Sequence, residues 1–219
     1  MTDCKLLVCD LDNTLLKSPR ISSWQLIWDF LACDEATRKE GLISFKNGTF
    51  NYEQWCAHDT KTFRKHGLHK DHFAEICKDM VPSPNLRPTL EALRERGVRM
   101  AIVSGALNMI LETALPWHDD FFSDVHLNIA HFCEEGYLTR IEPTPYDFEG
   151  KLECVKKLCT DYGISTDDTV FVGDGPNDIS LAGQVGLTIA FGSQTDDVKE
   201  AFDVDMADDD FGRILEHIR

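Results

Sequence analysis

Two pairs of aspartates lie far apart in the sequence, and each pair follows directly after a short apolar segment. The first pair is Asp10 and Asp12, within Asp-Leu-Asp-Asn-Thr, and the second is Asp174 and Asp178, within Gly-Asp-Gly-Pro-Asn-Asp. Carboxylate oxygens are ligands of the kind that Mg²⁺ prefers, with water and a substrate phosphate completing the coordination. Histidines and cysteines are not interleaved with these acids, which argues against Zn²⁺. The residue types therefore predict a magnesium site, provided that the fold brings the two pairs together.

Two further places in the sequence have groups that could hold a phosphate. Ser104-Gly105 follows another apolar segment and is expected to open a helix, where a hydroxyl and backbone N–H groups would face an anion. Lys151, at the start of a predicted helix, could add a positive charge. Each of these features by itself usually has a structural explanation, as part of a turn, as a helix cap or as an exposed lysine. It is improbable that all of them are explained in this way, because they occur in this order and each falls where a strand ends or a helix begins.

The apolar segments around these motifs are typical of central parallel strands, which are covered on both faces. They are residues 5–9, 98–103, 169–172 and 187–191. Helices are predicted between them at residues 88–96, 151–162 and 179–185. This alternation predicts an α/β fold with a doubly wound parallel sheet, in which ligands bind at the carboxyl ends of the strands. Residues 129–142, divided by Glu135-Gly136, predict a small antiparallel hairpin.

Residues 17–82 do not fit the alternation of strands and helices. Three apolar stripes at helical spacing run through this segment, near Trp24, Trp55 and Ile76. The segment ends at Pro82-Ser83-Pro84, which is typical of a hinge. We therefore predict an all-helical insertion at 17–82, placed directly after the first strand of a core made of residues 1–16 and 83–219.

The amino-acid composition excludes some classes of binding partner. The 219 residues include 38 acidic and 22 basic side chains, for a formal net charge of −16. This excess of negative charge argues against nucleic acid or an anionic membrane as the main partner. A phosphorylated substrate stays possible where local cations or a metal ion reverse the field. The eight cysteines form no Cys-x-x-Cys motif, the start does not resemble a secretory signal, and no apolar segment could span a membrane. We expect a cytoplasmic protein with reduced thiols, and its oligomeric state is left open.

The motifs together resemble those of the haloacid dehalogenase-like superfamily. They are Asp10-Leu11-Asp12-Asn13-Thr14, Ser104-Gly105, Lys151 and Gly173-Asp174-Gly175-Pro176-Asn177-Asp178. The helical insertion after the first motif and the form of the last motif are most similar to the phosphoserine phosphatase-like branch, and the resemblance runs nearly end to end. It implies a Rossmann-like core with a helical cap, and a Mg²⁺-dependent phosphomonoester hydrolase acting on a small phosphorylated metabolite.

The resemblance also implies a role for each motif residue. Asp10 would attack phosphorus and form an aspartyl-phosphate, which carboxylate nucleophiles are able to do. Asp12 would protonate the leaving alkoxide and then activate water. The family's dehalogenases lack an acid at this position, so phosphoryl chemistry is favoured. Mg²⁺ would be held by Asp10, the backbone carbonyl of Asp12, and Asp174. Ser104, the Gly105 N–H, Lys151 and Asn177 would contact the phosphate, and Asp178 would orient Lys151 or a metal-bound water.

The cap departs from the pattern of phosphoserine phosphatases. Those enzymes use a cap Glu and a cap Arg to hold the ammonium and carboxylate of serine. Here Pro19 stands near the position of the Glu, and Asp59 falls about where the Arg is expected. We therefore expect a small phosphomonoester other than L-phosphoserine. Candidate cap contacts are Arg20, Trp24, Trp28, Tyr52, Trp55, Asp59 and Arg64, although packing inside the cap is the commoner role for any one of the aromatic residues.

Two alternatives share most of this chemistry. A phosphotransferase or mutase would have every motif and differ only in the group that accepts the phosphoryl group. A signalling module that is phosphorylated on an aspartate also uses Mg²⁺ and a lysine on an α/β sheet. Such a module has no helical cap and does not need an acid at Asp12, so the hydrolase is the favoured interpretation.

Overall fold

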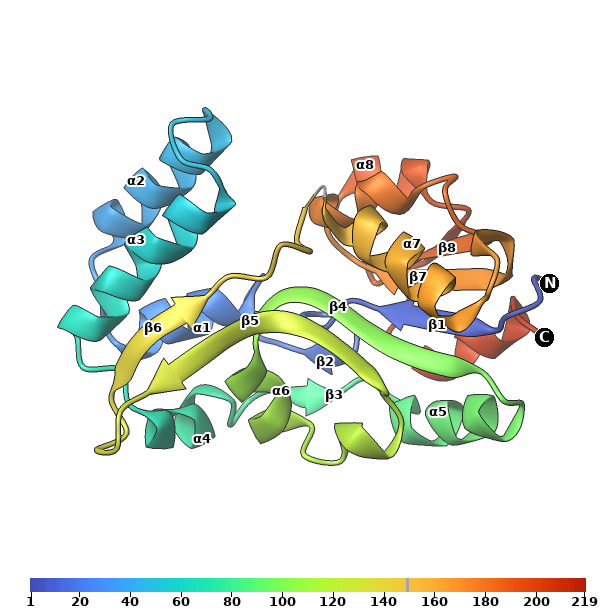
Figure 1. Cartoon of the computed structure of the whole chain (residues 1–219), viewed down its shortest axis with the longest axis horizontal. Coiled ribbons are helices and arrows are strands. Elements are labelled where there is room, and N and C mark those ends of the chain that lie inside the picture. Colours follow the sequence, from blue (N-terminus) through green and yellow to red (C-terminus); the bar gives the residue numbers. More distant parts are fainter. Residues whose placement is uncertain (149) are drawn as a thin grey trace.

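A computed structural model describes residues 1–148 and 150–219 of the chain. Its centre is a seven-stranded sheet with the strand order β6-β5-β4-β1-β7-β8-β9 (Figure 1). The strands are β1 (Leu6–Cys9), β4 (Arg99–Leu107), β5 (Asp124–Phe132), β6 (Leu138–Glu142), β7 (Thr169–Gly173), β8 (Leu187–Phe191) and β9 (Val204–Met206). The strands from β5 to β9 in that order pair in parallel, and β6 pairs antiparallel with β5. The mostly parallel α/β sheet and the hairpin at 129–142 are thus confirmed.

Strand β1 lies at the centre of the sheet, between β4 and β7, and its side chains divide between the two faces. Leu6 and Val8 pack with α7 (Gly150–Tyr162) and α8 (Asp196–Ala201) in one apolar cluster. Leu7 and Cys9 belong to a second cluster with α5 (Leu86–Glu95) and α6 (Asn108–Ala114). All four side chains are fully buried, and burial of one such aliphatic side chain contributes about 1.5–3 kcal/mol. The strand that carries the first motif is therefore rigidly placed.

The inserted segment contains four α-helices and the 3₁₀ helix η1 (Lys70–His72); the α-helices are α1 (Ser23–Phe30), α2 (Glu35–Lys46), α3 (Tyr52–Lys65) and α4 (Phe73–Ile76). Figure 1 shows α2 and α3 projecting as a pair, whereas α1 and α4 lie beside the sheet. Ile27 of α1 and Phe73 of α4 are buried in the same apolar cluster as α5 and α6. Helices α1 and α4 are consequently part of the main core, and α3, although it projects with α2, adds its fully buried Phe63 to the same cluster.

A two-stranded ribbon joins the insertion to the sheet. Strand β2 (Leu16–Lys17) pairs antiparallel with β3 (Val81–Pro82), so that the chain enters and leaves the insertion at neighbouring points. Ser83 Oγ also donates a hydrogen bond to the Thr14 carbonyl. The boundaries predicted at 17 and 82 fall in this ribbon, and the division into core and cap stays a prediction.

The local structure differs from the sequence predictions in three places. Ser104-Gly105 does not open a helix, because β4 continues to Leu107 and α6 begins at Asn108. Leu107 pairs with Asn128 of β5 after a register shift, and this pairing keeps the chain extended past the motif. The helix predicted at 179–185 is instead a 3₁₀ helix, η4 (Pro176–Leu181), in which the Asp178 carboxylate accepts a hydrogen bond from the Gly175 N–H and tightens the first turn. Helix α2 was not predicted.

The sequence of helix α2 has no clear helical pattern of apolar residues, because the helix is almost entirely exposed or half-buried. Of its twelve residues only Gly41 is buried, so no apolar stripe marks a core-facing side. Its start is nevertheless specified by Asp34, whose side chain accepts a hydrogen bond from the Thr37 N–H. Helix α3 begins at a capping box formed by Asn51 and Gln54, and it contains the apolar stripe predicted near Trp55.

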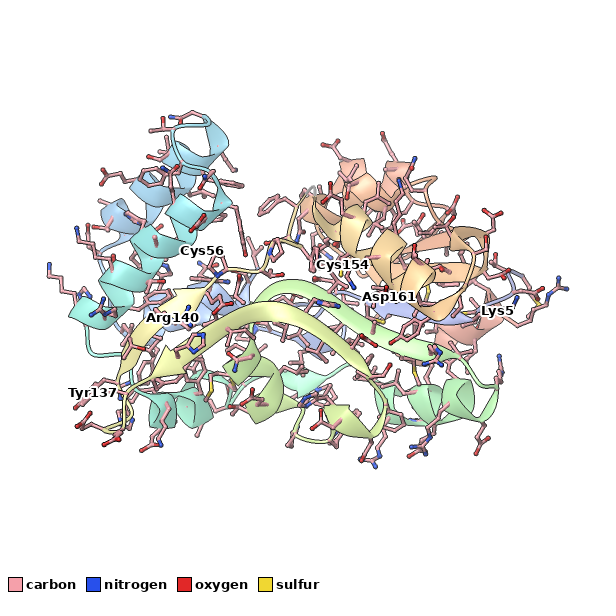
Figure 2. All side chains as sticks on the ribbon, in the orientation of Figure 1. Lys5, Cys56, Tyr137, Arg140, Cys154 and Asp161 are labelled. Atoms are coloured by element: carbon pink, nitrogen blue, oxygen red, sulfur yellow. The ribbon has the colours of Figure 1, made fainter. Side chains whose placement is uncertain are left out.

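All eight cysteines lie in the described residues and are free thiols, as expected. Most are buried, including Cys154 on α7 and Cys56 on α3, both of which are labelled in Figure 2. Burial raises the pKa of both thiols to about 12, which makes them unreactive as nucleophiles. Among the helices of the described residues, none combines the length and the apolar character that crossing a bilayer would require.

Candidate active site

A buried lysine joins two of the motif aspartates. Lys151 Nζ lies 2.6 Å from Asp10 Oδ1 and 2.5 Å from Asp178 Oδ1, and all three side chains are less than 10% exposed. Asp10 comes from the end of β1, Lys151 from the first turn of α7, and Asp178 from η4. Burial opposes the charged form of Lys151, but the two carboxylates outweigh it and hold the lysine pKa above its usual value. Three segments distant in sequence are thus fixed around one charge network.

Asp12 lies beside Asp10 in a different environment. Its Oδ2 accepts hydrogen bonds from both the N–H and the Oγ of Ser23, the first residue of α1, each at 2.8 Å. Its Oδ1 is buried and has no hydrogen-bond partner among the described residues. Burial raises the pKa of Asp12 to about 7, with a further contribution from the Asp10 charge, against the opposing effect of the Ser23 N–H. Near neutral pH this group can therefore serve either as an acid or as a base.

Asp174 completes a cluster of acids. Carboxylate oxygens of Asp10, Asp174 and Asp178 all lie within 4.8 Å of one another. Burial, and then the charges of Asp10 and Asp178, raise the pKa of Asp174 to about 8. Lys151 offsets only part of the charge of these three carboxylates, which otherwise repel one another. The all-oxygen donor set and this unbalanced repulsion fit a hard divalent cation, with Asp10 and Asp174 as predicted ligands that the fold does bring together.

Asp178 has a second attachment that supports its predicted positioning role. One oxygen contacts Lys151, and the other accepts a hydrogen bond from the Gly175 N–H at 3.0 Å. A side chain at residue 173 would also overlap the Asp178 carboxylate, so Gly173 is needed for this close approach. Both oxygens are thus engaged by the chain itself, which favours orientation of Lys151 over direct metal binding.

The predicted phosphate contacts gather at the end of β4. Ser104 is nearly fully buried, and its Oγ accepts a hydrogen bond from the Ala106 N–H at 3.2 Å. The Gly105 carbonyl accepts hydrogen bonds from Trp24 Nε1 at 2.7 Å and from Asn128 Nδ2 at 2.5 Å. With its carbonyl held from that side, the backbone of Gly105 has a fixed orientation towards the cavity that it lines.

Asn128 is a site residue that the sequence reasoning missed. It is fully buried on β5, where its Nδ2 also donates to Tyr52 Oη and its Oδ1 accepts from the Thr144 N–H. One side chain therefore links Gly105 of β4, helix α3 of the insertion and the segment before α7. The only sequence signal is a single amide in an otherwise apolar and histidine-containing strand, which is too weak to have identified it.

A cavity of about 980 Å³ separates the aspartates from the inserted helices. It is lined by Asp10, Asp12, Ser104, Gly105, Asp174 and Asn177 on the core side. Of the predicted cap contacts, Arg20, Trp24, Trp28, Tyr52, Trp55 and Asp59 line it, whereas Arg64 is exposed on α3 and does not. Arg38 and Lys46, from the unpredicted α2, and Asp147 and Phe148, from the segment before α7, are lining residues that were missed.

Among the predicted cap contacts, Asp59 and Arg20 differ in burial and in their partners. Asp59 is buried, accepts a hydrogen bond from Trp28 Nε1 at 3.2 Å, and lies 2.9 Å from His58 Nδ1. Arg20 is half-exposed and pairs with Asp29. Asp59 is therefore held in place by its neighbours in the wall of the cavity, and Arg20 lies at its rim.

The fold and this arrangement of acids around a lysine define a class of hydrolase. The family model described as haloacid dehalogenase-like hydrolase matches residues 4–186, and the chain belongs to this family. The resemblance seen in the motifs is thereby confirmed.

Particular relatives are phosphoserine phosphatases. That of Methanocaldococcus jannaschii is 27% identical over 219 residues, 98% of each chain. Phosphoserine phosphatase SerB2 of Mycobacterium tuberculosis is 34% identical over 122 residues, which is 55% of this chain but 29% of that protein. A solved structure of a phospho-aspartyl intermediate analogue of phosphoserine phosphatase superposes with a TM-score of 0.76 at 25% identity, covering 99% of this chain and 100% of the other. The chain is thus similar over its whole length to this branch of the family.

Proposed function

We propose that the chain is a Mg²⁺-dependent phosphomonoester hydrolase that acts through an aspartyl-phosphate on Asp10 and releases phosphate from a small phosphorylated metabolite. The observation that carries the proposal is that Asp10 and Asp12 both line the cavity but have different environments. Asp10 is oriented by Lys151, whereas Asp12 is anchored through one oxygen and has a pKa of about 7. Membership of a hydrolase family and similarity to phosphoserine phosphatases support it.

In the first step, a carboxylate oxygen of Asp10 attacks phosphorus as the bond from phosphorus to the ester oxygen breaks. Asp12, protonated, gives its proton to the departing alkoxide, so an alcohol leaves. In the second step, Asp12 as a carboxylate takes a proton from water, the water oxygen attacks the phosphoryl group, and inorganic phosphate and free Asp10 result. The Asp12 pKa of about 7 suits both directions of proton transfer near neutral pH.

The remaining polar groups stabilise the charge on the transferring phosphoryl group. Ser104 Oγ, the Gly105 N–H and the Lys151 ammonium are the donors that we assign to its oxygens, with Asn177 as a fourth, and loss of one such donor costs on the order of 10²-fold in kcat. Mg²⁺ held by Asp10, Asp174 and the Asp12 backbone carbonyl would supply the positive charge that offsets repulsion between the nucleophile and the phosphate.

We further propose that residues 17–82 form the cap that closes over the substrate, and that the substrate is not L-phosphoserine. The serine ammonium and carboxylate need one acidic and one basic partner, and here Pro19 stands near the first of the two places that hold such partners in phosphoserine phosphatases, and Asp59 about where the second is expected. Asp59 is already engaged by Trp28 and His58.

The test is phosphate release from a panel of phosphomonoesters that includes L-phosphoserine, with Mg²⁺ or with a chelator. We expect Mg²⁺-dependent turnover that is lost in Asp10→Asn and kept in Asp161→Asn, which makes the same change at an exposed position on α7 (Figure 2). Failure of the folded protein to release phosphate from any ester would overturn the hydrolase proposal and favour a transferase or a signalling module. A clear preference for L-phosphoserine would overturn the substrate proposal alone.

A further inference from the structure

One carboxylate in the cavity has no role in the proposed reaction. Asp147 lies in the segment between β6 and α7, and its Oδ1 accepts hydrogen bonds from Asn177 Nδ2 at 2.9 Å and from the Phe148 N–H at 2.8 Å. Its Oδ2 lies so close to Gly105 that a Cβ at that residue would overlap it. The Asp147 side chain therefore lies against two of the groups that we assign to the substrate phosphate, Asn177 and the backbone of Gly105.

A carboxylate and a phosphate compete for the same donors. Both are anions with several acceptor oxygens, and both are bound in proteins by amide and backbone N–H groups and by lysine. Asp147 is also near enough to Lys151 for its charge to favour the ammonium form. A phosphate entering this place would meet both the bulk and the negative charge of Asp147, and like charges at close range repel each other. The two anions exclude each other.

The residue that follows Asp147 is tied to the cap. The Phe148 ring packs at 4.9 Å from the ring of Phe45 on α2, and at 5.9 and 6.4 Å from the rings of Tyr52 and Trp55 on α3. Its backbone has a φ of 50°, in the left-handed region that is unfavourable for a bulky side chain. Contacts with the α2–α3 pair therefore hold Phe148 in a conformation that the local chain does not prefer.

We propose that Asp147 is a built-in anionic occupant of the phosphate subsite, which the phosphate group of the substrate must displace. Because Phe148 is the next residue, displacement of Asp147 withdraws the Phe148 ring from the aromatic residues of α2 and α3. Binding of phosphate is thereby coupled to movement of the cap, and a ligand without a phosphate leaves both in place. This inference rests on the proposed function, since it needs a phosphate subsite at Gly105 and Asn177.

The test measures binding of inorganic phosphate to the full chain in Mg²⁺, by calorimetry and by the intrinsic fluorescence of the cap tryptophans. The variants are Asp147→Ala, which removes the competing group, and Asp147→Asn, which removes only its charge. Asp161→Asn is the control, with the same change in net charge at an exposed acid. An occupied subsite weakens the apparent affinity in proportion to the fraction of molecules that are open. We expect phosphate to bind about tenfold more tightly to Asp147→Ala, less so to Asp147→Asn, and unchanged to the control.

Phe148→Ala tests the coupling separately. We expect this variant to bind phosphate with a much smaller change in tryptophan fluorescence than the wild type. Without the Phe148 ring, displacement of Asp147 no longer changes the surroundings of Trp55. If both Asp147 variants bind phosphate no more tightly than the wild type, Asp147 does not occupy the phosphate subsite, and the inference is wrong while the proposed function stands on its own turnover assay. If no variant binds phosphate at all, the inference and the phosphate subsite fail together.

Discussion

Replacement of Lys151 by methionine should destabilise the protein strongly, and the structure supplies a matched control on the same helix. Lys151 Nζ lies 2.5 Å from the Asp178 carboxylate, and Lys157 Nζ lies 2.5 Å from the Asp161 carboxylate. The first pair is 0% exposed on both sides, whereas the second is 57% and 52% exposed. Equal distances with opposite burial make the comparison a direct measure of what burial does to an ion pair.

The expected magnitude follows from what each substitution leaves behind. Lys151→Met leaves Asp10 and Asp178 as buried carboxylates without their common cation, and breaking a buried pair in this way costs about 3–5 kcal/mol. Lys157→Met leaves Asp161 in water, where a surface pair is worth little, so no measurable change is expected. The double variant Lys151→Met/Asp178→Asn should recover part of the loss, because only one unpaired buried carboxylate then remains.

The assay is urea denaturation of the four proteins in chelator at neutral pH, with the free energy of unfolding taken by linear extrapolation. Similar losses for Lys151→Met and Lys157→Met would refute the reasoning, because burial would then not decide the strength of the pair. A double variant less stable than Lys151→Met would also refute it, because Asp178 would then contribute by some means other than its bond to the lysine.

Three further predictions concern neighbouring groups. Asp12→Asn should lower kcat on alkyl phosphates by about 10²–10⁴-fold and affect p-nitrophenyl phosphate less, since that leaving group needs no proton; equal losses on both substrates would contradict the acid role. Asn128→Ala should lower the free energy of unfolding by about 1–3 kcal/mol, because buried partners lose their hydrogen bonds, and should raise KM; an unchanged urea midpoint would contradict this. The hydrogen bond with Asp59 raises the pKa of His58 above its usual value. The pair therefore stabilises the folded protein fully at a pH below the unfolded histidine pKa of about 6.5. This stabilisation is lost as the pH rises through the higher pKa of the folded state. The Tm deficit of His58→Gln should therefore be larger at pH 5.5 than at pH 8.5, and a deficit independent of pH would count against the pairing.

The parts of the fold that were predictable are those where one physical constraint dominates. A strand buried on both faces admits only apolar residues, so 5–9 and 169–172 were recognisable, and the polar residues after them marked the edge of the sheet. Asp10, Asp12, Asp174 and Asp178 were predicted by this means and Lys151 from the start of its helix, and the fold brings Lys151 into contact with both Asp10 and Asp178.

The parts that were missed depend on contacts between segments distant in sequence. Helix α2 buries only Gly41, so its sequence has no face to recognise. Strand β4 extends past Ser104 because Leu107 pairs with Asn128 of β5 after a register shift. The sequence near Ser104 does not indicate this pairing. Asp147 lies in a segment without helix or strand periodicity, and only its closeness to Gly105 gives it significance.

The position of Ser23 has a consequence for catalysis in a capped enzyme. The Asp12 carboxylate is held by the N–H and Oγ of this residue, which is the first of α1 and so belongs to the insertion, whereas Asp10 is held by Lys151 of the core. The acid–base group and the nucleophile are thus fixed by different parts of the fold. Helix α3 projects from the sheet but remains attached to α1, because Trp28 Nε1 donates a hydrogen bond to Asp59 and the Phe63 ring packs against the ring of Trp28. Movement of α3 should therefore be transmitted through α1 to Asp12, so that a change in the cap alters kcat as well as KM.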